Sequence, residues 1–138
     1  MVDVQILVRR FYDEIWNRLE LSTVEELLEE DLSFRGSLGQ SLHGRADFLA
    51  YVSSVTQALS SYHCEIDEIV TEGSRAAAKM TFSGIHDGEF LGYPPTHQLV
   101  EWTGAAFFAE REGKLSEIWV LGDLFNLTNL LQDQAGEK

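Results

Sequence analysis

The period of the hydrophobic residues changes once along the chain, near residue 60, and this change restricts the fold more than any other feature. Before it, apolar residues recur every three or four positions, which is typical of helices with one buried face. After it, apolar and polar residues alternate, which is typical of half-buried strands. Helices followed by a run of strands predict an α+β fold, not a parallel sheet of alternating strands and helices.

The first half is predicted to hold three helices and one short strand. Ser22 followed by Glu25 is a capping-box signature and predicts the start of the second helix. The expected elements are a helix over 4–19, a short helix after residue 22, a strand over 31–36 and a helix over 45–59.

Four strands joined by short connections are predicted to follow. Their expected positions are around 62–67, 76–86, 99–110 and 115–124, with a short helix over 126–132 at the end. Such a run of strands needs cover on one face, and three amphipathic helices can supply only part of it. We therefore predict one domain over 1–138, a curved antiparallel sheet with helices in its hollow side and a pocket between them.

Charge and composition exclude several classes of partner. The chain of 138 residues has 10 basic and 23 acidic residues and a formal net charge of −13. Nucleic acids and anionic membranes, which attract clustered Lys and Arg, are therefore not expected as partners. No apolar run reaches the length of about 18 residues that a membrane span needs, and no signal segment is visible, so we expect a cytoplasmic protein.

No cofactor or metal is expected either. The single cysteine, Cys64, is interpreted as a small buried hydrophobe, and the four histidines do not show the spacing of metal ligands. Motifs for phosphate, dinucleotide or nucleophilic chemistry are not found. Acid/base chemistry without a cofactor, or binding alone, remains.

Three polar residues within apolar strands are candidates for that chemistry. Asp123, at the end of the last strand, is either a helix N-cap or a working acid/base. His86 closes the alternating face of its strand and is either a hydrogen-bonded core residue or a second acid/base. Arg35 is either a surface residue or the counter-ion of a pocket carboxylate. Glu101 is expected to be a solvated strand residue.

Aromatic residues are the candidates for contact with a substrate, with packing in the core as the alternative. The candidates are Tyr12, Trp16, Phe34, Trp102 and Trp119. Strict alternation in the last strand places Trp119 on the same face as Leu115 and Asp123. It places Ile118 and Val120 on the outer face, where we expect a homodimer to form.

Several segments resemble the SnoaL-like polyketide cyclases, also called ester cyclases. They are the stretch from Gly84 to Thr96, which contains H-x-G-x-F-x-G-x-x-P-T, the segment from Gly113 to Asp123, and the N-terminal Phe11-Tyr12-Asp13-Glu14-Ile15-Trp16-Asn17. Together the segments extend the resemblance over roughly residues 4 to 132.

The resemblance implies an NTF2-like cone, in which N-terminal helices pack in the concave face of a bent sheet. It also implies an intramolecular aldol closure of a polyketide ester, without metal or cofactor, in which Asp123 is the general acid/base and His86 lies nearby. An apolar pocket would raise the pKa of such a carboxylate and so make it a better proton acceptor. The partner would be a small hydrophobic substrate. An isomerase or epoxide hydrolase on the same cone, and a non-catalytic binding or dimerisation module, are the alternatives.

Overall fold

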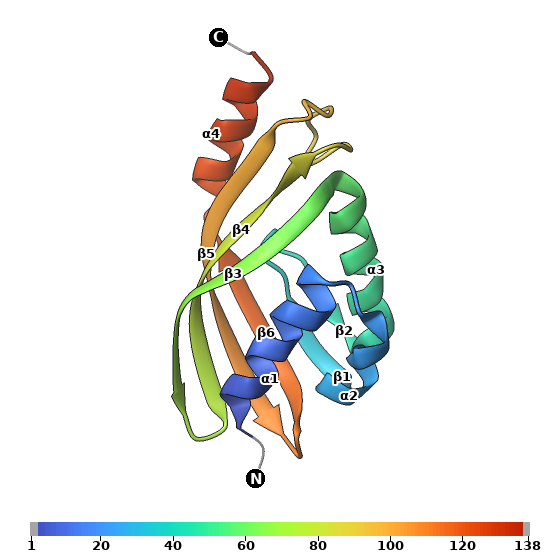
Figure 1. The fold of residues 1–138 in the computed structure, drawn as a ribbon, viewed down its shortest axis with the longest axis vertical. Coiled ribbons are helices and arrows are strands. Elements are labelled where there is room, and N and C mark those ends of the chain that lie inside the picture. Colours follow the sequence, from blue (N-terminus) through green and yellow to red (C-terminus); the bar gives the residue numbers. More distant parts are fainter. Residues whose placement is uncertain (1–2, 137–138) are drawn as a thin grey trace.

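Six strands form one strongly curved sheet that wraps around the N-terminal helix (Figure 1). The computed structural model describes residues 3–136. The strands are β1 (Leu28–Arg35), β2 (Ser41–His43), β3 (Leu59–Glu72), β4 (Arg75–His86), β5 (Leu99–Arg111) and β6 (Lys114–Gly122). Their order across the sheet is β2-β1-β6-β5-β4-β3. The pair β1–β6 is parallel and the other pairs are antiparallel. The sheet is therefore mixed, whereas the sequence predicted a purely antiparallel sheet.

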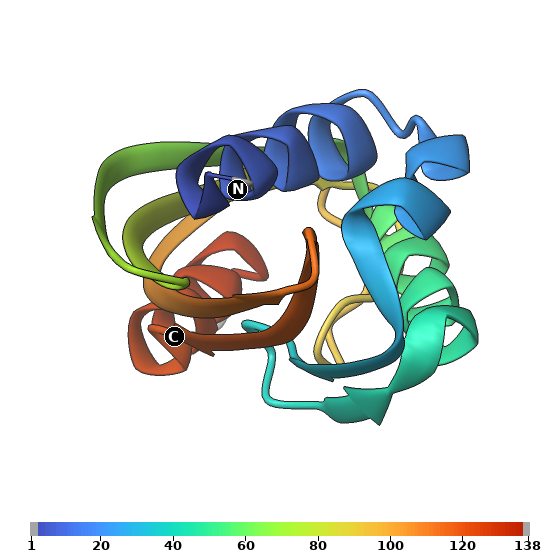
Figure 2. The same ribbon diagram turned by 90° about the horizontal axis from the view of Figure 1, so that it is seen from below.

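The helices lie where the hydrophobic period predicts them. They are α1 (Val4–Arg10), which continues into the π-helical segment η1 (Phe11–Asn17), the 3-10 turn η2 (Leu21–Thr23), α2 (Val24–Leu27), α3 (Gly44–Ala58) and α4 (Leu124–Gln134). Seen from below, α1 and α3 cover different sides of the space that the curved strands surround (Figure 2). The predicted curved sheet with helices in its hollow side is confirmed.

Two local predictions in the first half are wrong. The second helix is not capped by Ser22: α2 has Thr23 at its N-cap without a side-chain hydrogen bond to the helix. The Thr23 hydroxyl instead donates to the Glu20 carbonyl, 2.8 Å away, within the turn that precedes the helix. The short strand β2, which pairs with β1, was expected to be loop.

A bulge in β6 reverses the face prediction for the last strand. Glu117 pairs with Ala109 and Leu115 pairs with Glu110, so Ser116 is an extra residue between them. One extra residue moves every later side chain to the opposite face. Ile118 and Val120 therefore lie in the core, whereas Trp119 lies on the outer face.

The predicted inner face of β4 is confirmed. Ala76, Ala78, Met80 and Phe82 alternate with more exposed residues and are buried against the helices. His86 ends this buried face and is 0% exposed. The sheet curves around this apolar interior, and the site described next lies within it.

Candidate functional site

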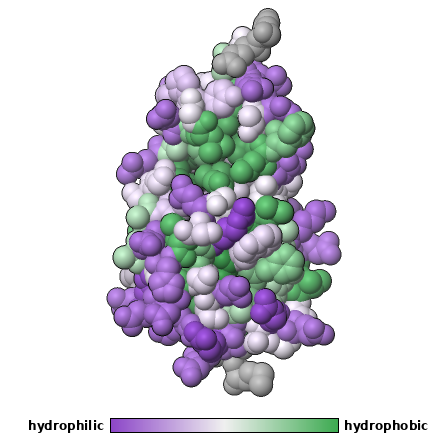
Figure 3. Space-filling model, turned by 180° about the vertical axis from the view of Figure 1, so that it is seen from behind, coloured by the Kyte–Doolittle hydropathy of each residue, from purple (hydrophilic) through white to green (hydrophobic). Residues whose placement is uncertain are grey.

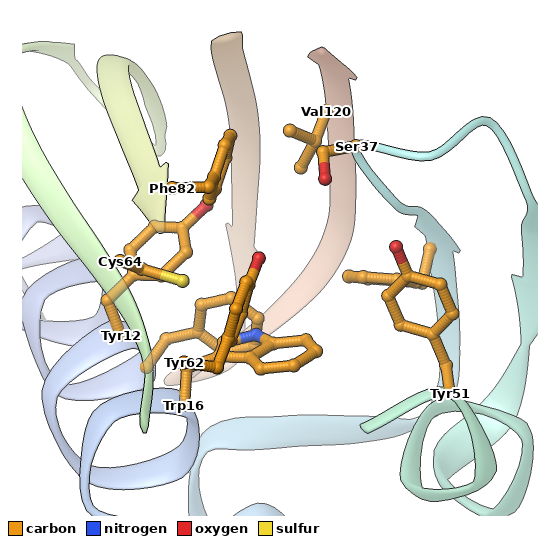
Figure 4. Close-up of a pocket in the computed structure, with 10 residues that line it drawn as sticks. Tyr12, Trp16, Ser37, Tyr51, Tyr62, Cys64, Phe82 and Val120 are labelled. Carbon is orange, nitrogen blue, oxygen red and sulfur yellow. The ribbon is translucent and has the colours of Figure 1, made fainter. Parts of the chain in front are cut away.

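A small cavity lies inside the cone, between the N-terminal helix and the inner face of the sheet (Figure 4). It is lined by Phe11, Tyr12, Trp16, Phe34, Ser37, Tyr51, Tyr62, Cys64, Phe82 and Val120. The cavity volume open to water is about 20 Å³. This is room for about one water molecule, so a ring-sized ligand requires the lining side chains to move.

The polar atoms of the cavity come from separate parts of the chain. Ser37 follows β1, Tyr51 lies on α3, and Tyr62 and Cys64 lie on β3. The hydroxyl groups of Ser37, Tyr51 and Tyr62 point toward the open middle of the cavity (Figure 4). The cavity is thus an aromatic enclosure with several hydroxyl groups and one thiol.

Two buried hydrogen-bond donors beside this space have no partner among residues 3–136. They are the hydroxyl of Tyr12, a lining residue, and Nε1 of Trp102, which is not a lining residue but packs against two of them. The Trp102 ring packs against Tyr62 and Phe82, at centroid distances of 6.2 and 5.5 Å. A Cβ added at Gly122 would lie 3.2 Å from Trp102 Nε1 and 2.5 Å from the Ser37 carbonyl oxygen, so Trp102 Nε1 and Ser37 are close neighbours. Unpaired buried donors are uncommon and costly.

The cavity is electrically neutral at physiological pH. Burial raises the pKa of Tyr12, Tyr62 and Cys64 well above their ordinary values. Burial also raises the pKa of Tyr51 to about 12, although hydrogen bonds from Leu38 and Ser37 oppose the shift. Asp, Glu, His, Lys and Arg are not among the ten lining residues. The lining therefore offers neutral O–H groups and lacks a side chain that accepts protons readily.

Asn17 fixes the distance between two walls of the cavity. Its Nδ2 donates to the Cys64 carbonyl oxygen at 2.9 Å, and its Oδ1 accepts from the Cys64 N–H at 2.7 Å. The side-chain amide thus pairs with β3 as a neighbouring strand would. Tyr12 and Trp16 on η1 are held against Tyr62 and Cys64 on β3. The π-helical turn, a geometry often found at functional sites, delivers Asn17 to this position.

Asp123 caps helix α4 and does not line the cavity. Its Oδ1 accepts from the Asn126 N–H at 3.2 Å, and its Oδ2 accepts from Asn126 Nδ2 at 2.6 Å. These contacts are those of a helix N-cap, one of the two interpretations of Asp123 from the sequence. Asp123 nevertheless follows Gly122, which packs on Ser37 of the cavity wall, so its backbone lies near the cavity.

His86 forms hydrogen bonds with the loop that follows β4. Its Nε2 lies 3.2 Å from the Tyr93 carbonyl oxygen, and its Nδ1 lies 3.4 Å from the Thr96 hydroxyl. A carbonyl only accepts, so Nε2 carries the hydrogen and Nδ1 accepts from Thr96. Phe90 of the same loop is buried and contacts both His86 and Trp102. The recognisable H-x-G-x-F segment therefore places Phe90 over Trp102.

The outer face of the sheet holds two of the predicted site residues. Arg35 donates to the Val120 carbonyl, and its guanidinium lies 5.3 Å from the centre of the Trp119 ring. Trp119 is 39% exposed and packs on Phe107. The structure does not bring either residue into the cavity. Glu101 is exposed on β5, as expected.

Three of the five predicted aromatic residues, Tyr12, Trp16 and Phe34, line the cavity, whereas none of the predicted polar residues does. Trp102 packs against the lining residues Tyr62 and Phe82. Contact of these residues with a substrate stays a prediction. Ser37, Tyr51 and Tyr62 were missed as site residues. The alternation of Tyr62 and Cys64 in β3 was a usable signal, because it places both side chains on the inner face.

Within residues 3–136 no group of three His, Cys, Asp or Glu side chains is placed to hold a metal ion. None of the described helices is both long and apolar enough to cross a membrane.

Comparisons with known proteins agree with the geometry. The family model of the SnoaL-like polyketide cyclases matches residues 6–131. No curated protein sequence matches the chain. AclR of Streptomyces galilaeus, a candidate hydroxylase, is similar with 25% identity and a TM-score of 0.79, over 94% of this chain and 96% of that chain.

Two further solved structures share the fold at lower identity. A candidate SnoaL-like polyketide cyclase from Jannaschia has 20% identity and a TM-score of 0.83, over 93% of this chain and 90% of that chain. An LEH-like epoxide hydrolase from M. tuberculosis has 14% identity and a TM-score of 0.75, over 95% of this chain and 86% of that chain. The fold is therefore the NTF2-like cone.

Proposed function

The chain belongs to the SnoaL-like polyketide cyclase family, and from this premise we propose that its cone binds a small hydrophobic carbonyl compound and promotes proton transfer on it without a cofactor. The observation that carries the proposal is the aromatic cavity with neutral hydroxyl groups directed into it. Flat apolar molecules are stabilised by aromatic walls, and O–H groups match carbonyl oxygens.

The hydroxyl groups would act on the oxygen of the bound carbonyl. When a proton leaves the neighbouring carbon, the electron pair of the C–H bond moves to that oxygen and an enolate forms. Fixed donors in an apolar cavity stabilise this developing charge more than they would in bulk water. The enolate then takes the proton back at carbon, or attacks a second carbonyl as in an aldol closure.

We propose Asp123 as the base that takes the proton. Its backbone neighbour Gly122 borders the cavity wall, which supports a position at the rim. To accept a proton from a ligand, the carboxylate must leave Asn126, to which it makes two hydrogen bonds. His86 is less suited to the second acid/base role, because both ring nitrogens are engaged within its loop.

Exchange of the methyl hydrogens of acetophenone in D2O tests this proposal, followed by proton NMR. The protein is expected to accelerate exchange, and Asp123→Asn to lower the rate by about 100-fold or more, as for loss of a general base. Asparagine is also a good N-cap, so the fold of α4 is preserved. Asp133→Asn, at the other end of α4, is the matched control. Equal rates in the parent and Asp123→Asn would remove Asp123 from the mechanism.

A binding module without catalysis is the second candidate. It is supported by the absence of a carboxylate or histidine among the ten lining residues, and by the small volume of the cavity. Binding of acetophenone without any acceleration of exchange would favour it. Epoxide hydrolysis has less support, because an Arg35–Asp123 ion pair is absent within the described part of the chain and Arg35 faces outward.

We also propose that two copies associate through the outer sheet face. Phe107, Trp119 and Leu121 are 46%, 39% and 51% exposed on neighbouring strands there, in place of the Ile118 and Val120 predicted from the sequence. Hydrophobic surface is visible on the back of the molecule (Figure 3). Sedimentation should show a dimer that Phe107→Glu disrupts and that Leu91→Glu, in a distant loop, leaves intact. A monomeric parent would contradict this.

A further inference from the structure

Two donors beside the cavity lack partners within residues 3–136. The Tyr12 hydroxyl and Trp102 Nε1 are fully buried without any partner. A buried unpaired donor loses its bonds to water and gains nothing in return, so it destabilises the free protein. Such groups in a native structure call for an explanation, and a ligand atom supplies one here.

We propose that Tyr12 Oη and Trp102 Nε1 donate hydrogen bonds to the oxygen atoms of a neutral aryl ketone or a similar carbonyl compound, and that this pair makes the cavity select such a ligand over a carboxylate. The inference rests on the proposed binding function and adds the chemical class of the ligand and the two residues that distinguish it. The aromatic contacts predicted for these residues do not by themselves require any oxygen on the ligand.

The chemistry of the two donors determines the type of ligand atom. An indole N–H only donates, so its partner must be an acceptor such as a carbonyl oxygen. A ligand without an acceptor would leave both donors unpaired and would lose the affinity that the site can offer. The two donors lie on η1 and β5, so both walls of the cone contribute to recognition.

The same residues disfavour an anion. The ten lining residues include neither Lys, Arg nor His, so nothing in the cavity would neutralise a carboxylate. Moving a carboxylate from water into an apolar enclosure is costly unless it is paired. Neutral donors satisfy a ketone fully but compensate a carboxylate only in part.

Three probes of nearly equal shape separate these effects. Acetophenone has the carbonyl, isopropylbenzene replaces the carbonyl by an apolar group, and benzoate carries a charge. Each is titrated into the ¹⁵N-labelled full chain at pH 7, and the indole N–H signals report binding. The signals of the three tryptophans are assigned with Trp119→Phe and Trp16→Phe. We expect acetophenone to bind at least tenfold more tightly than either of the other probes and to move the Trp102 N–H signal downfield.

Variants then assign the preference to the two donors. Tyr12→Phe removes only the hydroxyl, and Trp102→Phe removes the indole N–H. Each is expected to reduce the preference for acetophenone over isopropylbenzene at least threefold. Trp119→Phe, on the outer face, is the matched control and should leave the preference unchanged.

The outcomes distinguish the inference from the function on which it rests. Equal binding of acetophenone and isopropylbenzene, or a preference retained in either donor variant, would overturn the inference and leave the binding function intact. Benzoate binding as tightly as acetophenone would overturn the selection against anions. If none of the probes bound up to its solubility limit, the proposed binding function would fail, and the inference with it.

Discussion

Removing the Tyr12 hydroxyl should stabilise the protein in the absence of ligand. Tyr12 is 3% exposed, and its hydroxyl oxygen is buried without a hydrogen-bond partner. The substitution Tyr12→Phe keeps the ring, which packs edge-on against Phe11 and Phe108. The perturbation is therefore confined to one polar atom at the wall of the cavity.

The magnitude follows from two opposing effects. A buried unpaired hydroxyl costs about 1–3 kcal/mol of desolvation, and the substitution recovers this cost. The lost atom also made a handful of dispersion contacts, each worth about 0.1–0.2 kcal/mol. The net effect is a gain of roughly 1 kcal/mol in the free energy of unfolding, which for a domain of this size raises the Tm by about 3 °C.

Urea denaturation followed by tryptophan fluorescence measures the effect. Tyr51→Phe is the matched control, because the Tyr51 hydroxyl is not among the buried atoms without a partner. Its loss recovers no desolvation cost and should not stabilise the protein. A loss of stability in Tyr12→Phe would mean that the Tyr12 hydroxyl is already paired in the free protein.

Three further predictions follow from the same geometry. Absorbance at 295 nm should show Tyr51 ionising near pH 12, whereas Tyr12 and Tyr62 should ionise only at higher pH or on unfolding. Because the Tyr51 pKa is raised above its unfolded value of about 10, the contribution of Tyr51 to stability is present below pH 10 and is lost between pH 10 and 12. Ionisation of all four tyrosines near pH 10 would contradict this prediction. Asn17→Ala should lower the free energy of unfolding, measured by urea denaturation, by about 2 kcal/mol, because it leaves the N–H and C=O of Cys64 unpaired. A change within roughly 0.5 kcal/mol would show that water replaces the side-chain amide with equal strength. Phe90→Ala should cost about 3–5 kcal/mol in the same assay, and a surface-like cost below roughly 0.5 kcal/mol would mean that the loop is not packed on the core.

The fold could be predicted because helical and strand periods are local properties of the sequence. The buried alternation along β4 and the apolar stripe of α1 appear where the sequence places them. The face of β6 could not be predicted, because the bulge at Ser116 depends on how β6 pairs with β5. A single unpaired residue exchanged the positions expected for Trp119 and Val120.

The candidate site was harder to predict, since its polar groups come together only in the folded chain. Ser37, Tyr51 and Tyr62 lie on three separate elements, and nothing in their spacing marks them as neighbours. The H-x-G-x-F segment carried the resemblance to the family, but His86 bonds within its own loop. A recognisable motif thus identified the fold more securely than the chemistry.

A larger side chain in the cavity tests whether the ligand binds inside the cone. Val120 lines the cavity, whereas its neighbour Leu121 points to the outer face and is 51% exposed. The dissociation constant of acetophenone is measured for Val120→Phe and Leu121→Phe, after thermal melts show that both are folded. Val120→Phe is expected to weaken binding at least tenfold and Leu121→Phe to leave it unchanged. Unchanged binding in Val120→Phe would mean that the ligand binds outside the cone.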